Sequence, residues 1–187
     1  MAEEKSGEPQ EESEAAPIEK PEKTIDSRYQ YLVGINETKI FTLKSDKSRS
    51  YLLRHTNIFK YLEVNQSIGY WENNLTDDYL LKGVYLSLGI NYLFETQTAY
   101  FKPYAGAGIA LHELFIKMNG LDGAYSDPAS KGMNVNIGSY FPITDHISLQ
   151  GEYEYIHTDN IELRYHKYSD KKYLEQQNVF AGISINL

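Results

Sequence analysis

The stretch QNVFAGISINL at residues 177–187 decides the fold class of this chain. Every second residue of the stretch is apolar, and one side therefore carries Val179, Ala181, Ile183, Ile185 and Leu187. A helix repeats every 3.6 residues, whereas the side chains of a strand alternate with a period of two. Five consecutive matches to the period of two predict a β-strand with one apolar face.

The same alternation recurs in seven earlier segments, which are residues 28–37, 50–57, 61–71, 81–94, 99–112, 132–141 and 146–156. The connections alternate between long and short, at residues 38–49, 58–60, 72–80, 95–98, 113–131, 142–145 and 157–173. Tight turns at one end and long loops at the other are typical of an up-and-down barrel. The sequence predicts an all-β fold, an eight-stranded antiparallel barrel over residues 27–187.

The first 26 residues differ from the rest in composition. They hold nine acidic groups, three basic groups, three of the six prolines and no aromatic residue. Such a segment buries too little apolar surface to offset the loss of chain entropy on folding. We expect residues 1–26 to be a disordered acidic tail. Either a solvated leader or an interaction arm is consistent with this composition.

The face opposite the apolar one indicates which side of the barrel is inside. It is rich in glycine and amide residues, and the interior of an eight-stranded barrel is just wide enough for packed side chains. Charges of both signs also fall on this face, and inside a barrel they must be paired. The predicted interior polar network consists of Arg54, Glu63, Lys102, Glu152 and Glu154.

Aromatic residues gather near both ends of the predicted strands, as in Phe59, Tyr61, Tyr92, Tyr70 and Tyr155. Amphipathic rings at both membrane interfaces form the girdles of an outer-membrane barrel. We therefore expect a transmembrane barrel whose apolar face contacts lipid. A soluble ligand-binding β-barrel, with the two faces exchanged, is the alternative.

Two stretches, KPYAGAG at residues 102–108 and LQGEYEY at residues 149–155, are similar to the OmpA-like and opacity-protein-like small outer-membrane barrels. This resemblance implies a bacterial outer-membrane location, with lipid and lipopolysaccharide as neighbours. The last strand also resembles the family's C-terminal signal for the outer-membrane assembly machinery, here Val179, Ile183, Ile185 and Leu187. That signal usually ends in Phe, where this chain has Leu187. The resemblance does not assign a function, because such barrels include adhesins, anchors and enzymes.

One cluster of catalytic residue types stands at the start of the last long connection, with His157, Asp159 and Glu162. A histidine, an acidic group and a hydroxyl can form a hydrolytic site. The cluster locally resembles outer-membrane lipid A deacylases, in which a nucleophilic Ser follows the His by two residues. Asp159 occupies that position here, so we expect no catalytic role and keep a lipid A acyl hydrolase-like enzyme as an alternative. We expect no cofactor and no metal, and the chain has no cysteine.

The long connections carry basic residues that suit an acidic contact. The first holds Lys39, Lys44, Lys47 and Arg49, and the last holds Arg164, Lys167, Lys171 and Lys172 beside Tyr165 and Tyr168. They suit phosphates of lipopolysaccharide or an acidic host or matrix surface, and a merely solvated rim is the alternative. The leading hypothesis is a non-enzymatic outer-membrane anchor that presents four extracellular loops and keeps its tail periplasmic. A filled interior argues against an open porin, and no nucleic-acid signature is present.

Overall fold

The computed structural model describes residues 26–40, 43–76, 79–98, 100–118, 124–161 and 172–187. Of the predicted tail, only Asp26 is among them, as the first residue of a strand; the rest lies outside the described residues. The strands are β1 (Asp26–Ile40), β2 (Leu43–Lys44), β3 (Ser48–Phe59), β4 (Leu62–Thr76), β5 (Tyr79–Leu93), β6 (Lys102–Met118), β7 (Ala124–Pro142), β8 (Ile147–Ile161) and β9 (Lys172–Asn186).

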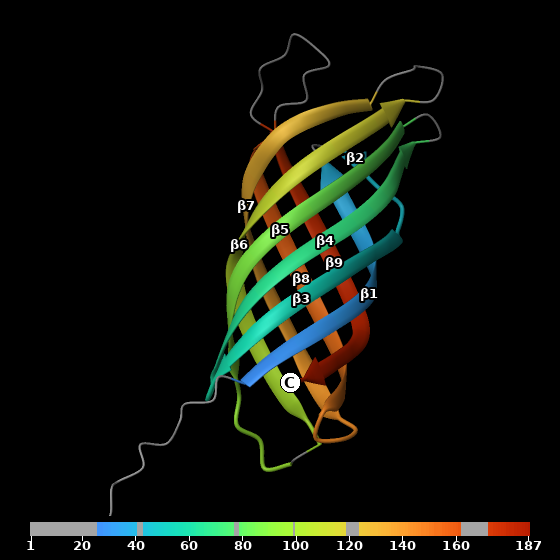
Figure 1. The fold of residues 1–187 in the computed structure, drawn as a ribbon. Coiled ribbons are helices and arrows are strands. Elements are labelled where there is room, and N and C mark those ends of the chain that lie inside the picture. Colours follow the sequence, from blue (N-terminus) through green and yellow to red (C-terminus); the bar gives the residue numbers. More distant parts are fainter. Residues whose placement is uncertain (1–25, 41–42, 77–78, 99, 119–123, 162–171) are drawn as a thin grey trace, which may run out of the picture.

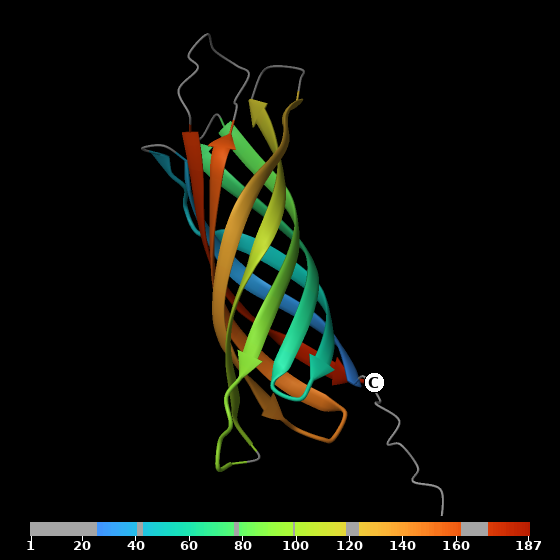
Figure 2. The same ribbon diagram turned by 90° about the vertical axis from the view of Figure 1, so that its left-hand side faces the viewer.

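Eight of these strands close into one antiparallel barrel (Figures 1 and 2). Consecutive strands pair with each other, and β1 pairs with both β3 and β9, which removes the open edges of the sheet. The two-residue β2 pairs only with β1. The predicted eight-stranded up-and-down barrel is confirmed. Among the described residues, no helix is long and apolar enough to cross a membrane.

The two ends of the barrel differ in their connections. We call the end with residues 60–61, 94–101 and 143–146 the turn end; β1 begins there and β9 ends there (Figure 2). The opposite end, the loop end, has longer strands than predicted. Much of the expected loop at residues 72–80 is strand, and Glu72 still pairs in register with Lys82. The prediction was wrong here because residues on both faces are polar, so the alternation signal stops although backbone pairing continues.

The outward face of the barrel carries a band of exposed apolar side chains, such as Ile109, Met133 and Val179, which are 62%, 66% and 59% exposed. Aromatic rings lie at both edges of this band, at Phe59, Tyr92, Phe101 and Phe141 toward the turn end and Tyr51, Tyr70 and Tyr155 toward the loop end. Beyond it at the loop end follow Glu37, Arg49, Glu72, Lys82, Glu113 and Lys131. A water-soluble barrel would bury these apolar residues, so the predicted lipid-facing orientation is confirmed.

Candidate functional site

An ion pair between Arg54 of β3 and Glu152 of β8 crosses the barrel interior. The Nη1 and Nη2 atoms of Arg54 lie 2.5 and 2.7 Å from the two carboxylate oxygens, and both residues are 4% exposed. Arg54 Nε donates to the Ser67 hydroxyl at 3.0 Å, and the Tyr104 hydroxyl donates to Glu152 at 2.5 Å. Bidentate geometry with further hydrogen bonds is what a buried ion pair needs to offset its desolvation. The pair therefore links two strands that are not neighbours in the sheet.

A second buried ion pair joins Arg28 of β1 to Glu63 of β4, with 2.8 Å between Nη1 and Oε1. The Tyr140 hydroxyl donates to the other oxygen of Glu63 at 2.9 Å. The guanidinium of Arg28 lies over the Tyr140 ring, 4.0 Å from its centroid. Gln30 connects the two ion pairs, because it donates to Tyr140 at 3.2 Å and accepts from Arg54 at 3.4 Å. The four charges of the two ion pairs thus form one network.

Glu154 of β8 is fully buried, and its hydrogen bonds come from neutral donors. They are the Tyr85 hydroxyl at 2.8 Å, Asn134 Nδ2 at 3.0 Å and Asn178 Nδ2 at 3.2 Å. These donors stand on β5, β7 and β9. Glu154 therefore links β8 to β5, β7 and β9, whereas the two ion pairs link β1 to β4 and β3 to β8.

An apolar cluster fills the barrel interior alongside this network. Its members, mostly from the loop-end halves of the strands, are Leu32, Leu52, Trp71, Leu81, Tyr85, Ala110, Leu114, Ile156, Leu174 and Phe180. Glycines make room for the large rings: a Cβ added at Gly69 would overlap the Tyr85 ring, and one at Gly83 would overlap the Trp71 indole. Seven of the eight barrel strands contribute to this cluster, and β7 buries Tyr140 in the same interior, which is packed as expected for this strand number.

Two residues of the interior differ from the sequence prediction. Lys102 was expected in the network, but it is exposed as the first residue of β6, at the turn end. The alternation assigns its face correctly, yet the strand starts there and the side chain reaches solvent. Arg28 pairs with Glu63 in its place. Sequence reasoning missed Arg28, although it precedes Gln30 by two residues and so shares its inward face.

The catalytic candidates His157 and Asp159 lie on the outward face of β8 near the loop end. His157 Nε2 is 3.0 Å from Asp159 Oδ1, and the His157 ring stacks on Tyr173 with 6.0 Å between centroids. The hydroxyl of Thr158 is buried on the opposite face of the strand, so it is separated from this pair. Glu162 lies outside the described residues. Across the described ranges, no three His, Cys, Asp or Glu residues are placed to hold a metal ion.

A polar cleft of about 430 Å³ lies on the outer surface at the loop-end edge of the apolar band. This rim cleft is lined by Ser48, Arg49, Tyr51, Tyr70, Glu72 and Asn74. The two tyrosine rings stack with 6.4 Å between centroids. Glu72 accepts hydrogen bonds from Tyr70 at 2.7 Å and from Lys82 at 2.8 Å, so its charge is balanced. The exposed guanidinium of Arg49 therefore gives the rim cleft a positive group that is available to an anion.

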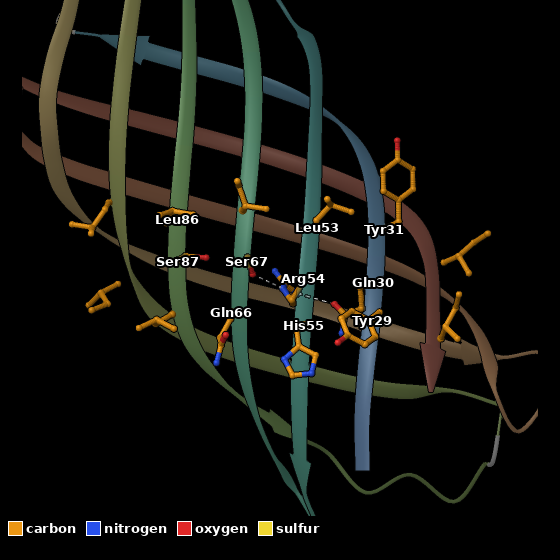
Figure 3. Close-up of a pocket in the computed structure, with 16 residues that line it drawn as sticks. Tyr29, Gln30, Tyr31, Leu53, Arg54, His55, Gln66, Ser67, Leu86 and Ser87 are labelled. Atoms are coloured by element: carbon orange, nitrogen blue, oxygen red, sulfur yellow. Dashed lines mark hydrogen bonds between the residues drawn. The ribbon is translucent and has the colours of Figure 1, made fainter. Parts of the chain in front are cut away.

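A larger groove of about 930 Å³, which we call the waist groove, runs over the outer surface of β1, β3, β4, β5, β6 and β9. Figure 3 shows the side chains around it, most of which are apolar, such as Leu53 and Leu86. Its outward-pointing lining also includes two polar residues, His55 and Gln66. The groove therefore combines an apolar wall with two hydrogen-bonding side chains.

The predicted C-terminal signal lies on β9, the strand that closes the barrel against β1. Its side chains Val179, Ile183, Ile185 and Leu187 all point outward and are 48–71% exposed. The Leu187 backbone N–H donates to the carbonyl of Ser27 at 2.9 Å, so the last residue of the chain is paired with the start of β1.

Comparison with known proteins agrees with this architecture. Neisserial surface protein A has a TM-score of 0.73 at 18% identity, over 85% of this chain and 96% of that chain. The outer membrane protein OprG from Pseudomonas aeruginosa has a TM-score of 0.60 at 13% identity, covering 87% and 96%. Ail, the attachment invasion locus protein of Yersinia pestis, has a TM-score of 0.55 at 16% identity, covering 87% and 99%. At these identities the likeness concerns the fold. No curated protein matches the sequence.

The family is shown by the sequence itself. A model of the outer membrane protein beta-barrel domain matches residues 28–184, nearly the whole barrel. The resemblance to small outer-membrane barrels that the sequence indicated is thereby confirmed. The chain belongs to the outer membrane protein beta-barrel family and is a protein of the bacterial outer membrane.

Proposed function

We propose that this protein is a non-enzymatic anchor of the outer membrane that presents its loop end for structural or adhesive contact. The observation that carries the proposal is the packed interior, in which buried ion pairs and an apolar cluster leave the rims and loops as the surface for partners. A scaffold of this kind holds loops in place, and loops are where small barrels place their function.

The orientation follows the rule for such barrels, in which short turns face the periplasm and longer connections face the outside. The turn end, with the start of β1 and therefore the acidic tail, is periplasmic in this proposal. The loop end is extracellular. The C-terminal residues of β9 would contact the assembly machinery during insertion, since they form the outward face of the closing strand.

The chemistry of the loop end favours an acidic partner. The last connection carries Arg164, Lys167 and Lys171 beside two tyrosines, and Lys172 follows at the start of β9. Guanidinium and ammonium groups bind sulfate and phosphate oxygens well. Ail has been solved with the heparin analogue sucrose octasulfate, at a TM-score of 0.56 and 16% identity to this chain. We propose a sulfated or otherwise acidic polysaccharide as the adhesive ligand class.

In this proposal the rim cleft binds lipopolysaccharide of the surrounding membrane. Arg49 stands just beyond the apolar band, at the depth where the phosphates of lipopolysaccharide lie in an outward-facing loop end. The stacked Tyr51 and Tyr70 rings offer a flat face for a sugar ring, and the exposed Asn74 side chain offers hydrogen bonds. An Arg49→Gln variant should retain less lipopolysaccharide after purification than the unchanged protein, as measured by lipid analysis.

The adhesive proposal is tested with the full chain in lipid nanodiscs and immobilised heparin as the acidic ligand. Changing Arg164, Lys167, Lys171 and Lys172 together to Gln should weaken binding about tenfold or more, because each lost cation removes a charge-assisted contact. The matched control removes four basic groups from the other end, at Lys5, Lys20, Lys23 and Lys102, and should bind unchanged. Equal binding by both variants would contradict the proposal.

A further inference from the structure

Three hydrogen-bonding residues stand in a row across the middle of the apolar band. Tyr29 of β1 is the register partner of His55 of β3, which is the register partner of Gln66 of β4. We call these three residues the waist row, and Figure 3 shows them side by side. Along β3, His55 is midway between Tyr51 and Phe59, which lie at the two edges of the band. His55 is therefore near mid-depth in the membrane rather than at an interface. The line of register partners rises from the turn end toward the loop end, so Tyr29 lies one strand step below His55 and Gln66 one step above it.

The waist row is polar, whereas the residues that flank it on the neighbouring strands are apolar. On either side the register continues with apolar residues, Ile185 of β9 before Tyr29 and Leu88 then Ile109 after Gln66. The ring of His55 packs against Tyr29 with 4.8 Å between centroids. Within the described part of the chain, the side chains of His55 and Gln66 have no hydrogen-bond partner, and Gln66 is exposed.

Lipid chains cannot satisfy these side chains, because hydrocarbon has no donor or acceptor. Polar groups facing the membrane interior are costly, and where they occur they mark a functional contact. A second protein molecule in the membrane can supply the donors and acceptors that these side chains lack. The imidazole, the carboxamide and the phenol hydroxyl each can both donate and accept, so the row is complementary to a second row of the same composition.

We propose that the waist row is the contact between two copies of this protein in the membrane. A two-fold axis near His55 would bring Gln66 of one copy toward Tyr29 of the other, so one patch would serve both partners. The apolar walls of the waist groove, which include Leu53, Ile68 and Leu86, would then pack around the hydrogen-bonded centre. Pairing would also set two loop ends side by side, which strengthens attachment to a repetitive ligand.

The dimer is tested with the full chain in lipid vesicles, by energy transfer between donor- and acceptor-labelled copies at increasing protein-to-lipid ratios. The double variant His55→Leu and Gln66→Leu should weaken association about tenfold, as expected for the loss of several hydrogen bonds in a membrane. It should fold normally, because apolar residues suit the outward face. The matched control is Gln177→Leu, which removes an exposed amide outside the waist groove and should leave association unchanged.

Disulfide trapping in intact cells gives an independent readout, since the chain has no cysteine of its own. With an added thiol oxidant, Ile68→Cys in the waist groove should form a covalent dimer, whereas Ile137→Cys on the outward face of β7 should not. The proposal is overturned if the protein is monomeric at every lipid ratio or if the double Leu variant associates like the unchanged protein. It is equally overturned if Ile68→Cys is trapped with a different protein instead of a second copy.

Discussion

The Arg54→Met substitution tests whether the interior ion pair holds the barrel together. Met has a length similar to Arg but no charge, so Glu152 would keep its carboxylate in the interior without its 2.5 and 2.7 Å contacts. Glu154 stands two residues away on the same inward face, and the variant would leave both carboxylates without Arg54. Removing one partner of a buried ion pair costs about 3–5 kcal/mol, because the other charge is left uncompensated.

The assay is equilibrium unfolding in urea from lipid vesicles, followed by the fluorescence of the buried Trp71. With a slope of about 2 kcal/mol per molar urea, a loss of about 4 kcal/mol lowers the midpoint by roughly 2 M. The double variant Arg54→Met and Glu152→Gln removes both charges and should recover most of this loss. The reasoning is refuted if the single variant unfolds within about 0.3 M of the unchanged protein, or if the double variant is the less stable of the two.

Three further predictions follow from the packing and the closing strand. Gly69→Ala should cost about 1–3 kcal/mol, because its Cβ would overlap the Tyr85 ring, whereas Gly151→Ala, which has open space around it, should leave the urea midpoint unchanged. The purified protein in planar bilayers should show no stepwise conductance, since its interior is packed; regular channel steps would contradict that packing. Leu187→Asp should lower the amount of folded protein in isolated outer membranes, whereas Leu187→Phe should maintain it; equal amounts would argue against a role in assembly.

The alternation of residue types determined a large part of this structure by itself. In the last strand, five outward apolar residues ending at Leu187 were enough to predict a strand with one lipid-facing side, and seven similar segments predicted the barrel. The sequence also predicted which face of each strand is inside, because glycines such as Gly69 are needed where large rings pack in the interior. Alternation predicts membrane-spanning strands well because successive residues face lipid and the barrel interior in turn. Lipid requires an apolar side chain, whereas the interior takes polar or small ones. Above the apolar band the outward face meets water and carries polar residues, so the alternation signal ends there and the predicted loops were too long.

The partners of the interior charges were decided by the tertiary structure. Arg54 and Glu152 are 98 positions apart, and Arg28 took the place that the sequence assigned to Lys102. Alternation states which face a side chain occupies, but not its height along the barrel axis. That height depends on the register between strands and the tilt with which the sheet closes. The register between β1, β3 and β4 likewise aligned Tyr29, His55 and Gln66, so a polar row on the lipid-facing surface emerged only once these strands were paired.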